Sequence, residues 1–303
     1  MQPNIGRVYG DSVEIAYEGM LRRDIRPHLG ASVLAAMRPL DLQAAYQQMI
    51  ERGLSGRTVR YTHVVLKSAM RQTLRWHLLL EKPADGVEIP QQLRGEMRSF
   101  TVEQAQTFLK AALATSHGPV LAVALTTGMR PSEYLGLKWP DIDWTRQTVS
   151  VVRSVRRLDG RWYFCDTKRS RSRRPIKLQR WIVGLLRDLQ RRASADNLCP
   201  ETDDLVFKTA SGQPINSDYL AKHFRSILDL AGLSRIRLYD LRHSAATIAL
   251  AAGVSPKVVS EQLGHASTAF TLATYAHVLP HMQDEAAAKV EAMLLAQGNV
   301  VDA

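Results

Sequence analysis

The sequence is poor in the features that mark several large classes of protein. Its 303 residues include only two cysteines, Cys165 and Cys199, too few for a disulfide framework or a four-cysteine zinc site. No apolar run approaches the roughly 18 residues that a membrane-spanning helix needs, and no N-terminal segment resembles a signal peptide. These absences favour a reducing compartment, so we expect a cytoplasmic, nucleoid-associated location and no membrane partner.

The sequence also lacks the short motifs on which much phosphate chemistry depends. It contains no Gly-x-x-x-x-Gly-Lys loop, no glycine-rich dinucleotide turn and no His-Glu-x-x-His pair. No cluster of acidic residues stands out as a two-metal nuclease site. We therefore expect no metal and no cofactor, so any phosphate chemistry would have to use protein side chains alone.

What the sequence does have is positive charge. Lysine and arginine number 40 against 29 acidic residues, which gives a formal net charge of +11 at pH 7. A balance this basic indicates a polyanionic partner, either nucleic acid or an anionic membrane, with a merely basic protein as the alternative. We expect duplex DNA to be the partner.

A short segment containing Pro83, Gly86 and Pro90 shows no periodicity and predicts a linker around residues 82–99. The fold class that follows is mainly α, with a helical domain over residues 1–90 and a mixed α+β domain over residues 91–303. In the first domain we predict helices over 12–23, 42–52 and 55–80, with Asp41 and Ser55 as caps. The core face of the third helix would carry Val59, Leu66, Met70, Leu74 and Leu78.

The third helix also carries a row of basic residues that falls mostly on another face. A row of this kind can neutralise phosphates along a duplex, and an ordinary solvated face is the equally good alternative. The residues are Arg60, Lys67, Arg71 and Arg75.

The second domain begins with a capping box at Thr101 and Gln104. We predict helices over 102–115, 118–128, 179–192, 216–231, 240–251, 255–263 and 268–275, and a C-terminal helix over 281–296 that packs on its own domain or on a neighbouring subunit. Three short strands, over 148–153, 161–165 and 174–178, would form a small antiparallel three-stranded sheet, the first pair joined through Asp159-Gly160. The second connection is a groove-binding tip or a solvated loop with four basic residues, Lys168, Arg169, Arg171 and Arg173.

Four separated motifs contain the residues best suited to phosphate chemistry. Arginine forks pair with phosphate oxygens at fixed geometry, lysine can protonate a leaving alkoxide, and a tyrosine hydroxyl can act as a nucleophile. The motifs are Thr127-Gly-Met-Arg130-Pro-Ser-Glu133, Thr167-Lys168 ahead of Arg173-Arg174-Pro-Ile, Asp240-Leu-Arg242-His243, and Leu263-Gly-His265 with Tyr275 ten residues on.

In their order and spacing these motifs resemble the tyrosine recombinase (phage integrase) family, and the resemblance covers most of the chain. It implies that Arg130 and Arg242 clamp the scissile phosphate and that Lys168 is the general acid. It implies that His265 hydrogen-bonds the phosphate, that Glu133 is a supporting acidic residue and that Tyr275 is the nucleophile of a 3′-phosphotyrosyl intermediate. It further implies a helical core-binding domain, a homotetramer on DNA that can be monomeric without DNA, and possible DNA-bending accessory proteins.

One departure from the family pattern concerns proton transfer. The family usually has histidine three residues before the second arginine, and here that position is Tyr239. A phenol, with an ordinary pKa of about 10, is a poorer proton shuttle at neutral pH than an imidazole at about 6.5. We expect Tyr239 in the pocket, with slow chemistry or dependence on another base. His243 should point about 100° away from Arg242 and serve local packing or a hydrogen bond.

The sequence supports a site-specific recombinase, an integrase of a mobile element, as the first hypothesis. The second is a catalytically weakened DNA-binding regulator of the same fold, which Tyr239 alone favours. A relaxing topoisomerase with tyrosine chemistry is a third.

Overall fold

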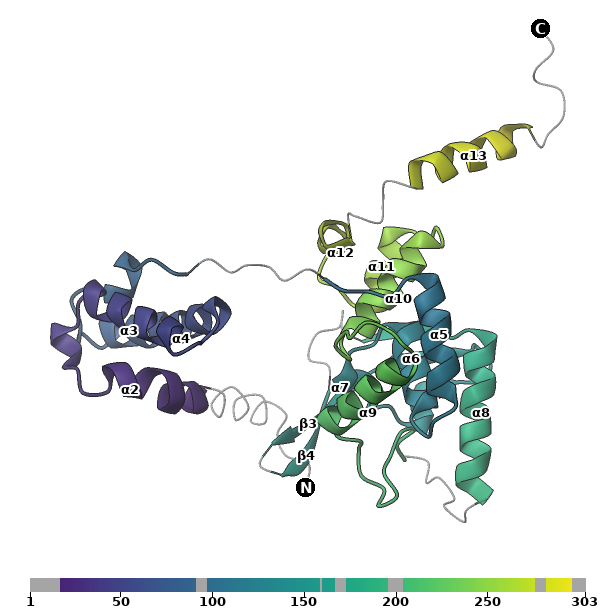
Figure 1. Ribbon diagram of the computed structural model, residues 1–303, viewed down its shortest axis with the longest axis horizontal. Coiled ribbons are helices and arrows are strands. Elements are labelled where there is room, and N and C mark those ends of the chain that lie inside the picture. Colours follow the sequence, from purple (N-terminus) through teal and green to yellow (C-terminus); the bar gives the residue numbers. More distant parts are fainter. Residues whose placement is uncertain are drawn as a thin grey trace, which may run out of the picture. The chain divides into compact units, whose positions relative to one another are not determined.

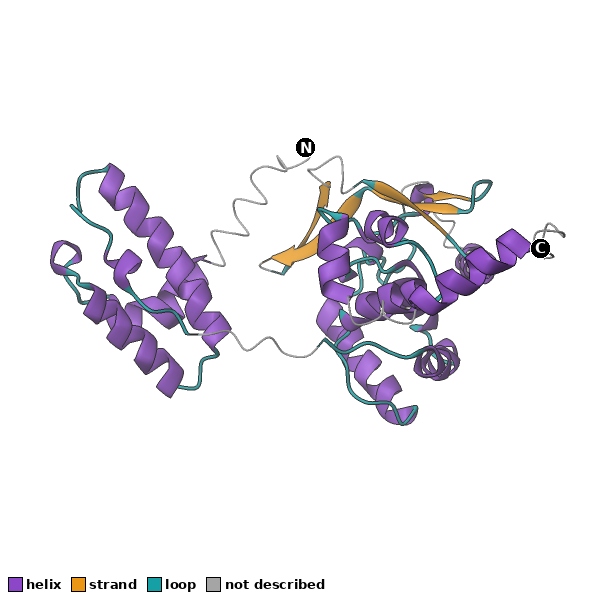
Figure 2. Cartoon of the chain, turned by 90° about the horizontal axis from the view of Figure 1, so that it is seen from above, coloured by secondary structure: helices purple, strands orange, loops and turns teal. Residues whose placement is uncertain are grey.

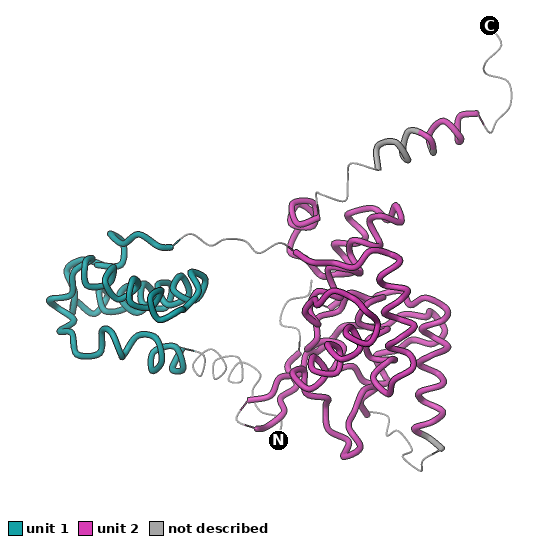
Figure 3. Tube along the Cα trace, viewed as in Figure 1, with its two compact units in different colours: residues 1–96 teal, residues 97–303 magenta. Residues whose placement is uncertain are grey.

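The structure, a computed structural model, describes residues 17–90, 97–158, 160–166, 173–195, 204–275 and 282–295. The chain divides into two compact units, residues 1–96 and residues 97–303 (Figure 3). Each unit has a buried core of its own. None of the helices within the described ranges combines the length and apolar character that crossing a membrane requires.

The first unit is helical, and the start of α4 is where the sequence predicts it. Helix α3 begins at Pro39, before the predicted Leu42, so Asp41 lies in the first turn and Arg38 is the N-cap. The predicted start at residue 12 lies outside the described residues. Ser55 caps the long helix by accepting a hydrogen bond from the Thr58 N–H at 3.2 Å, and the Asp41 carboxylate accepts the Arg38 N–H at 2.8 Å. The core lies between α3 and α4 and includes Leu42, Tyr46 and Met49. The elements are η1 (Leu21–Ile25), α2 (Arg26–Leu29), η2 (Leu34–Ala36), α3 (Pro39–Glu51), α4 (Gly56–Arg75) and η3 (Pro83–Gly86).

Helix α4 ends at Arg75, earlier than the predicted end at Leu80. The chain turns at His77, which adopts a left-handed conformation with φ of 56°. The turn changes which leucine faces the core: Leu79 is buried and Leu78 is exposed, so the prediction for Leu78 was wrong. The prediction extended the helical repeat beyond Arg75, where the helix has already ended, and therefore assigned Leu78 to the wrong side of the chain.

The second unit is built around α6, with other helices packed on several sides (Figure 1). Residues 120–125 are all buried, so this helix is apolar on every face, as a central helix must be. Helices α5, α7, α8 and α10 contact it. The helices are α5 (Val102–Leu113), α6 (Gly118–Thr127), α7 (Pro131–Tyr134), η4 (Trp139–Asp141), α8 (Arg180–Ala195), α9 (Ser217–Leu230), α10 (Asp240–Ala251), α11 (Pro256–Leu263), α12 (Thr268–Tyr275) and α13 (Met282–Leu295).

The strands form two small antiparallel sheets (Figure 2). A three-stranded sheet has the order β1-β2-β5, from β1 (Ile142–Asp143), β2 (Thr148–Val151) and β5 (Arg174–Lys177). A separate hairpin pairs β3 (Arg153–Leu158) with β4 (Arg161–Asp166). We predicted one sheet in which the strand at 148–153 pairs with the strand at 161–165. That pairing is not observed, because the chain leaves the first sheet at Val152.

A smaller apolar cluster joins the last helices of the unit. It consists of Ala246 and Leu250 of α10, Val259 and Leu263 of α11, and Tyr275 at the end of α12. On α13, the described side chains include exposed Val290, Met293 and Leu294. The cluster fixes α12 against α10 and α11, and so determines where the ring of Tyr275 lies.

Candidate active site

The first arginine is presented by a tight junction between α6 and α7. Gly128 ends α6 with φ of 64°, a conformation that favours glycine, and a Cβ there would lie 2.5 Å from Leu263 Cδ2. Arg130 then becomes the N-cap of α7, and its side chain is partly exposed. Its backbone N–H donates to Glu133 Oε2 at 2.9 Å and its Nη1 donates to Oε1 at 2.8 Å. The junction therefore holds the guanidinium of Arg130 at the surface of the fold.

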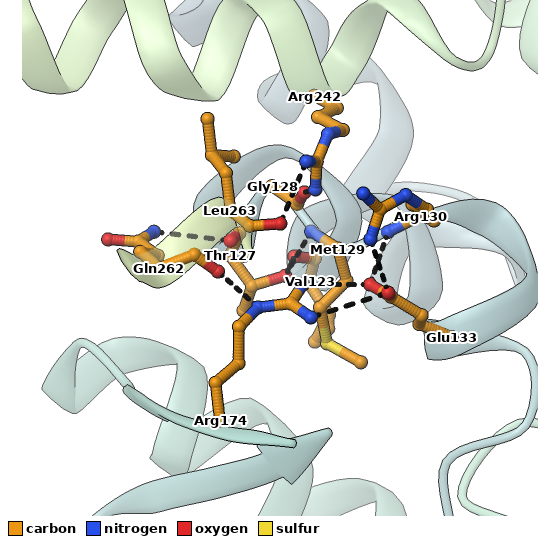
Figure 4. Close-up of polar contacts among 10 residues, drawn as sticks. All are labelled: Val123, Thr127, Gly128, Met129, Arg130, Glu133, Arg174, Arg242, Gln262 and Leu263. Carbon is orange, nitrogen blue, oxygen red and sulfur yellow. Dashed lines mark hydrogen bonds and ion pairs between the residues drawn. The ribbon is translucent and has the colours of Figure 1, made fainter. Parts of the chain in front are cut away.

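Glu133 is the buried centre of the site, with only 4% of its surface exposed. Besides Arg130, its carboxylate accepts hydrogen bonds from Arg174 Nη2 at 2.8 Å and Nη1 at 3.3 Å (Figure 4). Burial alone would raise the pKa of this carboxyl, but the hydrogen bonds and charges of Arg174 and Arg130 outweigh burial and lower the pKa. Glu133 is therefore ionised at neutral pH and links two guanidinium groups.

Arg242 lies on the first turn of α10 and is buried. Its Nη1 donates to Gly128 O at 2.7 Å and its Nη2 donates to Leu263 O at 2.7 Å. These carbonyls lie at the C-terminal ends of α6 and α11, where the helix dipole favours a cation. Burial and the nearby charge of Arg130 lower the pKa of Arg242 to about 10, which leaves it charged at neutral pH. These two bonds occupy only two of the five N–H donors of the guanidinium.

Arg174 was not among the predicted site residues, and the structure places it beside them. It enters from β5, donates from Nε to Gln262 O at 2.5 Å, and packs on Gly264, where a Cβ would lie 2.9 Å from its Nη1. Gln262 in turn donates from Nε2 to Thr127 O at 3.2 Å. The sequence signal was the motif Arg173-Arg174-Pro-Ile, but it did not indicate which arginine would turn inward.

His265 follows the left-handed Gly264 that ends α11. Its Nδ1 lies 2.7 Å from Thr271 Oγ1 on α12, which fixes the orientation of the ring. Burial, followed by the charges of Arg242 and Arg130, lowers the pKa of His265 to about 4. A neutral imidazole next to guanidinium groups can donate one hydrogen bond to an anion without adding to the charge of the site.

Tyr275 ends α12 and has 0% of its surface exposed. Its hydroxyl lies 2.9 Å from His243 Nδ1. Burial raises the pKa of the Tyr275 phenol to about 12, although the charge of Arg242 acts in the opposite direction. The hydrogen bond predicted for His243 is therefore present. Its partner is the candidate nucleophile Tyr275, which the sequence did not indicate.

Tyr239 precedes α10 and is 41% exposed. It lines a cavity of about 520 Å³ together with Arg130, Arg156, Trp162 and Asn216. Its ring lies edge-on to His243, with 5.6 Å between ring centroids. The phenol therefore lies beside Arg130 in an open cavity, whereas the hydroxyl of Tyr275 is enclosed.

The predicted DNA-contacting residues fall in different surroundings. Lys168, Arg169 and Arg171 lie outside the described residues, and the exposed Arg173 lies 3.9 Å from Asp166. On α4, Arg71 and Arg75 are exposed. Arg60 donates to Pro90 O at 3.1 Å, and Lys67 pairs with Asp85 at 2.7 Å. The four basic residues of α4 thus do not form one uniform row.

The arrangement as a whole is suited to binding an anion beside a tyrosine. Two guanidinium groups, those of Arg130 and Arg174, pair with the carboxylate of Glu133, and the buried Arg242 adds a third positive charge nearby. A second buried carboxylate, Asp240, is paired with Arg237 at 2.8 Å. Within the described ranges, no three His, Cys, Asp or Glu side chains are placed to hold a metal ion. The unbalanced positive charge lies where the ends of α6, α10 and α11 meet.

Comparison with known proteins identifies the family. The model of the phage integrase family matches residues 97–282. A XerC-like tyrosine recombinase of Caldanaerobacter subterraneus is 25% identical, over 90% of this chain and 75% of that protein. The ICEBs1 integrase of Bacillus subtilis is 25% identical, over 82% of this chain and 69% of its own length. The Tn1549 transposon integrase, solved with a circular intermediate DNA, has the same fold, with a TM-score of 0.77, 20% identity and 93% of both chains covered. The chain belongs to the phage integrase family of tyrosine recombinases, which are DNA strand-transferring enzymes.

Proposed function

We propose that this recombinase cleaves and rejoins duplex DNA at a specific site through a 3′-phosphotyrosyl link to Tyr275, for the integration or excision of a mobile element. The observation that carries the proposal is the positively charged cluster of Arg130, Arg174 and Arg242, in which Arg130 and Arg174 pair with Glu133, with a buried tyrosine beside it. A phosphodiester carries the single negative charge and the oxygens that such a cluster binds.

Each residue then has a defined part in one displacement at phosphorus. Arg130 and Arg242 bind the non-bridging oxygens, and His265 donates a further hydrogen bond to them. The Oη–P bond to Tyr275 forms as the P–O5′ bond breaks, and Lys168 protonates the leaving oxygen. Glu133 and Arg174 position Arg130. Because the phosphotyrosyl link conserves the energy of the broken bond, neither ATP nor a metal ion enters the scheme.

The same proposal covers the DNA partner, the cellular location and the oligomeric state of the protein. Relatives include an ICE integrase and a transposon integrase solved with DNA, which supports duplex DNA as partner and a mobile element as the substrate. The first unit would serve as the core DNA-binding domain, with exposed Arg71 and Arg75 on α4 as phosphate contacts. The protein would act in the cytoplasm at the nucleoid, as a homotetramer on DNA, with or without DNA-bending accessory proteins.

The test is covalent trapping on a nicked duplex. The duplex is first selected for binding from a random pool and then nicked next to the cleavage position, so that the released fragment diffuses away. Wild type should give a protein–DNA adduct on a denaturing gel, and Tyr275→Phe should give none. Tyr134→Phe is the matched control, because Tyr134 is also buried and its hydroxyl has no hydrogen-bond partner among the described residues. Binding without any adduct from wild type would instead support the DNA-binding regulator.

A further inference from the structure

We infer that His243 is the base that accepts the proton of Tyr275 during strand cleavage, in place of the histidine that the family has at the position of Tyr239. The inference rests on the proposed function, in which Tyr275 is the nucleophile. It starts from one contact: His243 Nδ1 lies 2.9 Å from the Tyr275 hydroxyl. An atom at this distance is within reach of the proton that must leave before or during attack.

The packing of α10 explains why this histidine faces the tyrosine. Successive helical residues diverge by about 100°, so Arg242 faces the ends of α6 and α11 while His243 faces α12. One and two turns further along α10, Ala246 and Leu250 belong to the same buried cluster as Tyr275. The apolar cluster thus holds the phenol ring, and His243 is the polar group that α10 adds at its hydroxyl.

Among the described residues, the other polar side chains of the site are poorer acceptors. Tyr275 has no exposed surface, so bulk water does not reach it in this state. Arg242, whose charge acts on the Tyr275 hydroxyl, is a cation without an acceptor atom. His265 is the weaker base and uses its Nδ1 at Thr271, 2.7 Å away. Tyr239 is a phenol that lines the open cavity beside Arg130.

The protonation state of His243 fits the role. Burial lowers its pKa, with Asp240 opposing the shift and Arg242 adding to it, so the ring is neutral at pH 7. A neutral ring with its proton on Nε2 presents the lone pair of Nδ1 to the tyrosine. The charged or titratable groups around it come from its own helix, the segment before it, α12 and the turn before α12: Asp240, Arg242, Arg237, Tyr239, Tyr275 and His265.

The step balances without a further reactant. As the Oη–P bond forms, the O–H bond of Tyr275 breaks and an N–H bond forms at Nδ1 of His243. The P–O5′ bond breaks at the same time, and the leaving oxygen takes its proton from Lys168. Because the phenol is a much weaker acid than protonated imidazole, the proton moves during attack and not before it. In rejoining, His243 returns the proton to the departing phenolate.

The kinetic test compares wild type with His243→Asn, whose side-chain oxygen can keep the hydrogen bond but cannot act as a base at neutral pH. Cleavage of the selected duplex at pH 7 should fall by about 10²–10³-fold, within the range for loss of a general base. Above the pKa of His243 the wild-type rate should level off with pH, whereas the variant rate should keep rising as hydroxide replaces the base. His223→Asn, a half-buried histidine on α9, is the control.

A second substrate separates this role from that of the leaving-group acid. With sulfur replacing the bridging 5′ oxygen, the leaving thiolate needs no proton. Lys168→Ala should then recover most of its rate, and His243→Asn should not. A wild-type rate for His243→Asn on both substrates would overturn the inference. Faster cleavage by His243→Asn than by wild type would also overturn it, because the hydrogen bond with His243 would then only hold Tyr275 in its buried position.

A measurement without DNA keeps the inference distinct from the proposed function. Long-range ¹H–¹⁵N NMR of the full chain at pH 7 should show His243 neutral, with the proton on Nε2, and a shift of Nδ1 in Tyr275→Phe. A proton on Nδ1 would refute the assignment of the base even if adducts form. If wild type forms no adduct, the proposed function fails, while the tautomer still decides whether Nδ1 can accept the tyrosine proton.

Discussion

Replacing Glu133 with glutamine should destabilise the second unit more than its small change in shape suggests. The carboxylate accepts hydrogen bonds from the Arg130 N–H at 2.9 Å, Arg130 Nη1 at 2.8 Å and Arg174 Nη2 at 2.8 Å. Glutamine keeps the shape but removes the charge, and its amide group turns N–H donors toward guanidinium N–H donors. Arg174, itself only 6% exposed, would lose the carboxylate with which it pairs.

The expected loss in free energy of unfolding follows from the burial of this ion pair. Removing one partner of a buried ion pair typically costs about 3–5 kcal/mol. Arg174 keeps its hydrogen bond to Gln262 O, so we expect the lower end, about 3 kcal/mol. For a unit of this size, each kcal/mol lowers Tm by about 2–4 °C, which predicts a decrease of about 6–12 °C.

Urea and thermal unfolding followed by tryptophan fluorescence measure the effect, since every tryptophan except Trp76 lies in the second unit. Glu261→Gln, at an exposed position on α11, is the control. The folded pKa of Glu133 is depressed, so its stabilisation is present above its ordinary pKa and is lost as pH falls through the folded value. The difference between wild type and variant should therefore shrink in acid. A loss below about 1 kcal/mol, or an equal loss in Glu261→Gln, would show that Arg174 does not depend on Glu133.

Two further predictions concern His265 and α4. The pKa of His265 is about 4 in the fold, so stability should decrease as pH falls from about 6.5 toward 4, and His265→Asn should lack that part of the decrease in urea unfolding. If α4 contacts DNA, Arg71→Ala and Arg75→Ala should each reduce the slope of log affinity against log salt by about one, measured by fluorescence anisotropy. Lys67→Ala should reduce it less, because Lys67 already pairs with Asp85; equal slopes for all three would contradict this.

Local signals in the sequence were enough to predict most helices. Ser55 and Thr101 cap helices where predicted, and Gly128 ends α6 in the left-handed conformation that favours glycine. Two predictions were wrong where the sequence carries no strong turn or capping residue: the end of α4 and the pairing of the strands. The end of α4 depends on a left-handed His77, a conformation that is uncommon for residues other than glycine, and the strand pairing depends on a break at Val152.

The partners within the site could not be predicted, because they are set by packing between distant segments. Arg174 and Glu133 are 41 residues apart, and His243 and Tyr275 are 32 residues apart. Helical geometry correctly predicted that His243 diverges from Arg242. It could not predict that α12 lies on the side to which His243 points, since that follows from the apolar cluster around Leu250 and Leu263.

The same packing explains how the protein keeps three arginines close together before any phosphate is present. Their mutual repulsion is offset by groups that do not leave on binding: the carboxylate of Glu133 and the carbonyls of Gly128, Gln262 and Leu263. These carbonyls belong to the ends of α6 and α11, so Arg174 and Arg242 are oriented by rigid helices, whereas Arg130 is oriented by Glu133. Arg242 uses two N–H groups for this purpose and has three others with which to meet an anion. Donors fixed in advance need little reorganisation in the transition state, which is where such electrostatic stabilisation is most effective.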